Sequence, residues 1–215
     1  MLNRFIAQTM PTPALTRRGF LKLSAGATGG LMLGAALRPV SAAAQGGVDG
    51  LATPFVHIRP DNTVVGIVKH LDKGQGTATG LATLVADELD ADSAQVTTEF
   101  APANTDLYAN TLMGVQGTGG STAMANSWQQ YREAGATARS MLIAAAAQTW
   151  GVDPAGISIA GGQITDGSQS ASLGDMAETA AGQSVPESVT LKTPDQWVYI
   201  GKSFPRVDVV RKSQG

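Results

Sequence analysis

The chain has no cysteine, only two histidines, and few aromatic residues. Without cysteine it forms no disulfide, holds no cysteine-ligated iron–sulfur cluster and offers no thiolate nucleophile. With only His57 and His70 present, a histidine-rich metal site is not expected. The glycine-rich segment at 117–122 contains no Gly-Lys-Ser/Thr, so it is not a nucleotide P-loop. Stability must therefore come from packing or from partners.

Acidic residues are absent from the first 44 positions, where five basic residues occur. Residues 16–22 read Thr-Arg-Arg-Gly-Phe-Leu-Lys, and a Gly- and Ala-rich apolar run follows at 23–37. That run is shorter than the ~20 residues of a spanning helix, which disfavours an N-terminal membrane anchor. Val40-Ser41-Ala42 offers a small-residue cleavage site. The pattern predicts a twin-arginine signal peptide over 1–44 and a periplasmic location, with any membrane association made through partners.

Beyond that segment, ten basic residues are present against seventeen acidic ones. This negative balance argues against nucleic acid or an anionic membrane surface as a partner. The remaining ~170 residues are enough for one domain with a substantial core.

Hydrophobic periodicity and turn signals predict an α/β (α+β) fold, a mixed sheet with packed helices. Residues 45–54 are expected to be a linker and 185–215 an extended tail. Ser172 is the expected N-cap of the last helix, with Asp175 completing a capping box. Between linker and tail, the pattern predicts strands at 55–58, 63–68 and 94–100, a tight hairpin at 157–164, and helices at 79–89, 121–150 and 172–181.

The first glycine loop, residues 69–76, ends in Gly74-Gln75-Gly76 between a predicted strand and a predicted helix. Free backbone N–H groups at a helix start can hold an anion or an oxo ligand, and Gln75 adds a neutral amide donor. Thr77 or Thr79 could cap the helix. On this tripeptide alone, an ordinary tight turn with a helix cap is favoured over a ligand site.

The spacing Gly74-x-Gly76-x-x-x-Gly80, with Glu99 about 20 residues on, also imitates a dinucleotide fingerprint. Several polar residues separate the strand from its first glycine, whereas the fingerprint's glycine follows the strand at once. The sequence shows no clear repeat of strand, helix and strand. Dinucleotide binding is therefore a minor alternative.

The second glycine loop, residues 117–122, reads Gly-Thr-Gly-Gly-Ser-Thr and leads into the long helix. Its backbone amides and the hydroxyls of Thr118 and Ser121 could cradle a phosphate, with Gly119 and Gly120 allowing close approach. The alternative is a flexible loop with a helix cap, the commoner outcome for this composition.

Arg132 and Arg139 lie seven residues apart and share one face of the predicted long helix. They could pair with a phosphate, but a solvent-exposed helix face is the favoured interpretation. Trp128, Tyr131 and Trp150 are expected to pack in the interior rather than to stack on a substrate.

Taken together, several segments resemble a known family in their order along the chain. They are the twin-arginine segment, 69–76, Thr79-Gly80-Leu81, 86–89, Tyr108, 118–121, 132–136, 144–147 with 150–152, Leu191-Lys192, 200–202 and Pro205-Arg206. The chain resembles the N-terminal part of the molybdopterin-binding large subunit of the xanthine dehydrogenase family. The nearest subgroup is the isoquinoline 1-oxidoreductase beta subunit and membrane-associated aldehyde dehydrogenase type.

The resemblance assigns roles to both loops. The family's first loop reads Glu-Met-Gly-Gln-Gly; here Asp72 and Lys73 replace the first two residues, and 74–76 match. The resemblance implies that Gln75, between Gly74 and Gly76, contacts an oxo ligand of molybdenum. It also implies that Thr118, Gly119, Gly120 and Ser121 lie near the pterin. No catalytic residue is carried over, because the family's catalytic glutamate has no counterpart in this sequence.

The resemblance also implies a chemistry: hydroxylation of an aldehyde or an N-heteroaromatic ring with water as the oxygen source. The implied cofactor is molybdenum–molybdopterin in its cytosine dinucleotide form. Iron–sulfur clusters would lie on a small partner subunit, and a cytochrome c could accept the electrons. Since family subunits are several times longer, 55–184 is expected to be a partial cofactor-binding domain, either a fragment or one piece of a split subunit that is inactive alone. The alternative is a non-catalytic exported remnant or assembly module.

Overall fold

The computed structural model describes residues 50–214. The predicted signal peptide at 1–44 and most of the predicted linker at 45–54 lie outside these residues. Within 50–214, no helix combines the length and the apolar character needed to cross a membrane.

A four-stranded sheet forms the base of the fold, in the spatial order β1 (Leu51–Ala52), β2 (Val56–Ile58), β3 (Val64–Val68) and β4 (Val96–Phe100). The first three strands pair antiparallel, whereas β3 and β4 are parallel, with Val64 opposite Val96. This mixed sheet with packed helices confirms the predicted fold class, and the expected hairpin of β2 and β3 forms. Strand β1 falls in the segment expected as a linker, because Leu51 is buried and pairs with Ile58.

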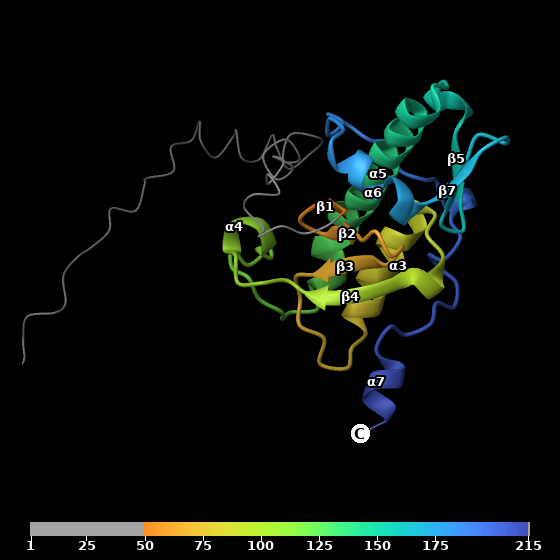
Figure 1. Cartoon of the computed structure of the whole chain (residues 1–215). Helices are drawn as coiled ribbons and strands as arrows, with labels where there is room; N and C mark the ends of the chain where they lie inside the picture. Colours follow the sequence, from red (N-terminus) through yellow and green to blue (C-terminus); the bar gives the residue numbers. More distant parts are fainter. Residues whose placement is uncertain (1–49, 215) are drawn as a thin grey trace, which may run out of the picture. The chain divides into compact units, whose positions relative to one another are not determined.

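Helix α3 (Thr77–Leu89) connects the two parallel strands, and the long helix α5 (Ala123–Trp150) packs along it. Figure 1 shows α5 crossing behind the strands with α3 beside it. The two helices approach closely at Gly135, where an added Cβ would lie 2.9 Å from the carbonyl oxygen of Val85. Only glycine allows this approach. The α3–α5 pair thus gives the sheet a helical layer.

A smaller antiparallel sheet follows, made of β5 (Ser158–Ala160), β6 (Gln163–Thr165) and β7 (Ser170–Ser172). It leads into α6 (Leu173–Ala181) through the predicted capping box, in which Ser172 and Asp175 each bond the other's backbone. The hairpin expected around 161–162 is confirmed. The remaining short elements are α4 (Thr105–Tyr108), α7 (Val209–Ser213) and single 3₁₀ turns at Ser93–Gln95, Pro154–Gly156 and Pro194–Gln196.

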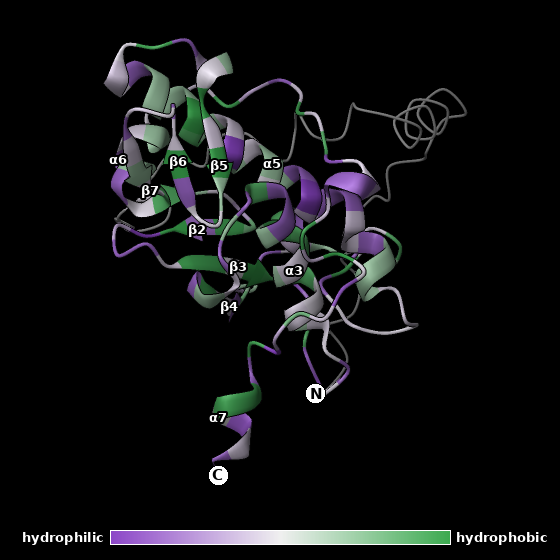
Figure 2. Ribbon diagram, turned by 90° about the vertical axis from the view of Figure 1, so that its right-hand side faces the viewer, coloured by the Kyte–Doolittle hydropathy of each residue, from purple (hydrophilic) through white to green (hydrophobic). Residues whose placement is uncertain are grey.

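The core lies between the main sheet and the helices, where β2, β3 and the inner faces of α3 and α5 contribute fully buried aliphatic residues. Figure 2 shows hydrophobic residues gathered along β2 and β3. Phe55 is central, with its ring 4.9 Å from Tyr131 and 5.7 Å from Tyr108. Tyr131 is therefore a core residue, as expected, and its hydroxyl donates to the carbonyl oxygen of Ile67 at the end of β3.

Arg132 is buried, which makes the expected solvent-exposed helix face wrong at this position. Its guanidinium forms an ion pair with Glu88 of α3 at 2.6 Å and donates to the carbonyl oxygen of Lys192. It also lies 5.5 Å from the ring centroids of both Trp128 and Trp197. A single sequence could not reveal this, because the partners come from a distant helix and from the tail.

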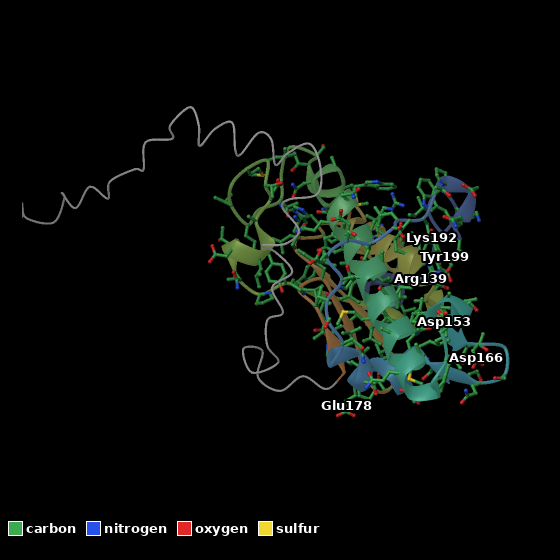
Figure 3. All side chains as sticks on the ribbon, turned by 90° about the horizontal axis from the view of Figure 1, so that it is seen from above. Arg139, Asp153, Asp166, Glu178, Lys192 and Tyr199 are labelled. Atoms are coloured by element: carbon green, nitrogen blue, oxygen red, sulfur yellow. The ribbon has the colours of Figure 1, made fainter. Side chains whose placement is uncertain are left out.

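The tail is fastened to the end of α3 rather than extended away from it. Lys192 donates its backbone N–H to Glu88 and forms an ion pair with Asp90 at 2.5 Å. The buried carboxylate of Asp87 accepts backbone N–H groups from the segment 198–200. Figure 3 shows Lys192, Tyr199 and Arg139 close together beside the helices. Carboxylates on α3 thus replace the water that the tail's backbone would otherwise need.

Candidate functional site

The two glycine loops meet at the carboxyl ends of the parallel strands β3 and β4. The backbone N–H of Leu71 donates to the hydroxyl oxygen of Thr118 at 2.8 Å. A ring nitrogen of His70 bonds the carbonyl oxygen of Gly117 at 3.1 Å. In open α/β sheets, ligands bind in the crevice outside this edge. The fold therefore brings together the two loops that the sequence singled out.

His70 fixes the second loop from the inside. It is fully buried, and its Nε2 lies 3.0 Å from the hydroxyl of Ser127 on α5. Burial lowers the pKa of His70, and the charge of Lys69 lowers it further, so the ring is neutral at pH 7. With one proton to place, Nδ1–H donates to Gly117 and Nε2 accepts from Ser127.

Asp72 caps helix α3, which corrects the expectation that Thr77 or Thr79 does so. The position before the helix is Gly76, at φ 86°, without a side-chain cap of its own. Instead the carboxylate of Asp72 accepts the backbone N–H groups of Gly74, Gly76 and Ala78, at 2.8, 3.3 and 2.9 Å. Although partial burial opposes it, these hydrogen bonds hold the pKa of Asp72 below its usual value. An internal anion thus occupies the helix start that was considered for an external ligand.

Gln75 is exposed, and its amide is engaged within its own loop. Its Nε2 donates to the carbonyl oxygen of Leu71 at 2.7 Å and to the hydroxyl of Thr77 at 3.0 Å. Its Oε1 accepts the backbone N–H of Lys73 at 2.6 Å. The backbone of Leu71 consequently links Gln75 to Thr118, because its C=O accepts from Gln75 and its N–H donates to Thr118.

The rest of the second loop makes a tight entry to α5. Ser121 adopts φ 54°, a strained left-handed conformation for a residue with a side chain. The hydroxyl of Thr122 donates to Gly119 and accepts from the amide of Asn110 at 2.7 Å. The loop is thus a hydrogen-bonded turn that leads into α5.

A cavity of about 450 Å³ opens between the loops at this sheet edge. Its polar lining includes Lys69, His70, Gln116 and Thr118. Of the predicted site residues, only Thr118 lines it; Gln75 and the segment 119–121 lie outside its lining. Sequence reasoning missed Lys69, although its place directly after a buried strand was a usable signal.

This cavity suits a polar anionic cofactor better than a free metal ion. Its lining carries a lysine and a hydroxyl but no carboxylate. Across residues 50–214, no group of three or more His, Asp or Glu residues is arranged to hold a metal ion.

The structure provides one feature that favours dinucleotide binding and two that argue against it. Strand β3, helix α3 and strand β4 do form a parallel crossover unit, which the sequence did not reveal. However, Asp72 occupies the helix start where a pyrophosphate would bind. Glu99, the acidic residue of the imitated fingerprint, forms an exposed ion pair with Arg59 at 2.6 Å.

Comparison with known proteins resolves the family. The sequence matches the family model of the molybdopterin cofactor-binding domain over residues 22–207. The chain belongs to this family, which confirms the resemblance seen in the sequence.

Two curated relatives are similar to the chain. A membrane-bound aldehyde dehydrogenase (pyrroloquinoline-quinone) of Gluconacetobacter polyoxogenes is 30% identical over 172 residues, which cover 76% of this chain and 21% of that protein. Isoquinoline 1-oxidoreductase subunit beta of Brevundimonas diminuta is 33% identical over 151 residues, which cover 66% of this chain and 19% of that protein. The chain thus spans about a fifth of their length.

Among solved structures, quinoline 2-oxidoreductase from Pseudomonas putida 86 is similar with a TM-score of 0.46 and 18% identity. The match covers 62% of this chain and 17% of that one.

Proposed function

We propose that this chain forms part of the cofactor-binding subunit of a molybdenum hydroxylase that oxidises aldehydes or N-heteroaromatic compounds, with water as the oxygen source. The observation that carries the proposal is the cavity between two hydrogen-bonded glycine loops in a chain of the molybdopterin cofactor-binding family. The names of the two relatives supply the substrate classes. When bound, molybdenum–molybdopterin, in its cytosine dinucleotide form, would supply a two-electron redox centre.

Both loops take part in this proposal. Gln75 would turn its amide from Leu71 and Thr77 toward an oxo ligand, a change open to an exposed side chain. The peptide groups of Gly74 and Gly76 would keep the loop in place through Asp72. In the second loop, Thr118, Gly119, Gly120 and Ser121 would face the pterin.

The partners follow from what this chain does not contain. Since it has no cysteine, the iron–sulfur clusters would lie on a small subunit. The remaining cofactor-binding surface would come from further large-subunit sequence, and a cytochrome c would accept electrons. Export through the twin-arginine route would place the complex in the periplasm.

The test is to isolate the 215-residue chain from its own cell envelope and measure its native mass, molybdenum, pterin and pyrroloquinoline quinone. We expect a complex that contains molybdenum and pterin. Within it, Gln75→Ala should lower hydroxylase activity at least about tenfold. The control Gln129→Ala removes an exposed amide on α5 that bonds only Glu133. A complex with quinone and no molybdenum, or equal activities of the two variants, would contradict the proposal.

A non-catalytic assembly module is the second candidate, because the first loop is already satisfied internally by Asp72 and by the amide of Gln75. A stable, cofactor-free monomer from the cell envelope would favour it. Co-purification with a polypeptide that carries the family's catalytic glutamate would favour the enzyme.

A further inference from the structure

Lys69 is a buried cation without a counter-ion. Its side chain lies at the end of β3, and the residue is 4% exposed. The ammonium donates to the carbonyl oxygen of Ala109 at 3.2 Å and to the amide oxygen of Gln130 at 2.6 Å. Both acceptors are neutral, and no Asp or Glu within 50–214 forms an ion pair with Lys69. A charge buried in this way is costly unless something supplies the opposite sign.

The other buried cations of the chain show the contrast. Arg132 is paired with Glu88, and Lys192 is paired with Asp90 and Asp87. Lys69 is equally buried, yet it lines a cavity instead of meeting a carboxylate. Burial lowers the pKa of Lys69 to about 8, so the amine is still mostly charged at pH 7.

The cavity beside Lys69 fits a small anion. Its lining contains no acidic residue that would repel one. The hydroxyl oxygen of Thr118 accepts from Leu71, which leaves the hydroxyl proton free to donate to a ligand. His70 is turned toward Gly117 and Ser127, so it does not compete for the anion. A buried lysine and a threonine with a hydroxyl proton to donate therefore both line a space of about 450 Å³.

We propose that this cavity binds a phosphate group, with Lys69 as its counter-ion and Thr118 as a hydrogen-bond donor. The phosphate belongs either to free inorganic phosphate or to a phosphate-bearing cofactor; in the second case the inference rests on the proposed function. The proposal assigns a role to Lys69, which lies in the segment 69–76 but received none from the sequence motif or from the family resemblance.

The test is a titration of the purified full chain with inorganic phosphate and with pyrophosphate at pH 7, followed by NMR of ¹³C-labelled lysine side chains. We expect saturable binding that raises the pKa of Lys69. Lys69→Met should weaken binding at least about tenfold, because it removes a buried counter-charge. Lys73→Met, the same change at an exposed lysine of the same loop, should leave the affinity within about twofold.

Several outcomes would overturn the proposal: no saturable binding of either anion, an unchanged pKa of Lys69 in the wild-type chain, or equal losses in the two variants. The wild-type measurement keeps the test decisive even if Lys69→Met fails to fold. Loading the chain with molybdopterin separates the two sources. If the cofactor's phosphate occupies the cavity, the loaded chain no longer binds free phosphate. A chain that binds phosphate through Lys69 but no pterin would disprove the proposed function while leaving this site intact.

Discussion

The backbone N–H of Leu71 donates to the hydroxyl oxygen of Thr118 across 47 residues of sequence, and this bond holds the two glycine loops together. The carbonyl oxygen of the same residue accepts from the side-chain amide of Gln75. The loops that the sequence marks separately therefore form one hydrogen-bonded unit at the edge of the sheet.

Thr118→Val should loosen this unit without unfolding the domain. Valine keeps the shape but removes the acceptor, so the Leu71 N–H loses its partner. Because Leu71 is exposed, the free energy of unfolding should fall by only about 0.5–1.5 kcal/mol. Amide hydrogen exchange at Leu71 should accelerate, as measured by NMR. Thr118→Ser retains the hydroxyl and serves as the control; equal exchange rates in the two variants would refute the link.

Glu88→Gln should be among the most damaging single changes. It leaves the buried guanidinium of Arg132 without its counter-charge, which typically costs about 3–5 kcal/mol. The matched control is Glu99→Gln in the exposed pair with Arg59, where less than about 1 kcal/mol is expected. Urea unfolding measures both, and a similar loss in the two variants would contradict the buried network's role.

Gly135→Ala should push α3 and α5 apart. The new methyl group would lie 2.9 Å from the Val85 carbonyl oxygen and 3.0 Å from the Cβ of Glu88, both packed in the helix interface. Such overpacking costs about 1–3 kcal/mol. Gly156→Ala is the control, since a Cβ there meets open space. Thermal melting should separate the two variants, and coincident curves would mean that the helices adjust freely.

The free energy of unfolding should rise between about pH 8 and pH 10 because of Lys69. Its folded-state pKa is lowered to about 8 from an unfolded value near 10.5, so the unfolded chain binds more protons in this window. Below pH 8 both states are charged and the burial cost is complete. Once Lys69 is fully deprotonated in the folded state, the loss of this burial cost raises the free energy of unfolding by roughly 3 kcal/mol.

Other buried groups act weakly in this window. The lowered pKa of His70 leaves it neutral in both states, and the raised pKa values of Tyr108 and Tyr131 oppose the rise only near pH 10, where tyrosines of the unfolded chain begin to ionise. Urea unfolding at several pH values should show the rise in the wild type and lose it in Lys69→Met. A rise of equal size in that variant would assign the effect to other groups.

Local sequence patterns predicted many of the elements of the fold. The hairpin of β2 and β3, the helices α3 and α5, and the Ser172–Asp175 capping box follow from short-range periodicity and cap chemistry. The strand at Leu51–Ala52 was missed because two residues leave no periodic signal. Its pairing with β2 is decided by tertiary burial.

The candidate site was predictable in its composition and not in its geometry. Glycine-rich segments before helices pointed to both loops. Asp72 supplies the helix cap, and Leu71 joins the two loops. Both roles arise from contacts in the folded chain that the residue types alone do not reveal. Lys69 was overlooked and Arg132 was wrongly placed on a solvent-exposed face, because the sequence does not state how deeply a charge is buried.

The fastening of the tail to α3 also has a consequence for synthesis on the ribosome. Glu88 emerges 104 residues before Lys192, the residue whose backbone N–H it accepts. Glu88 can pair with Arg132 once α5 has been made, but the carboxylate of Asp87 must wait for its partners at 198–200. The packing of α3 is therefore completed only by late-made sequence, and nascent chains are expected to carry an open end of α3 until that sequence has emerged.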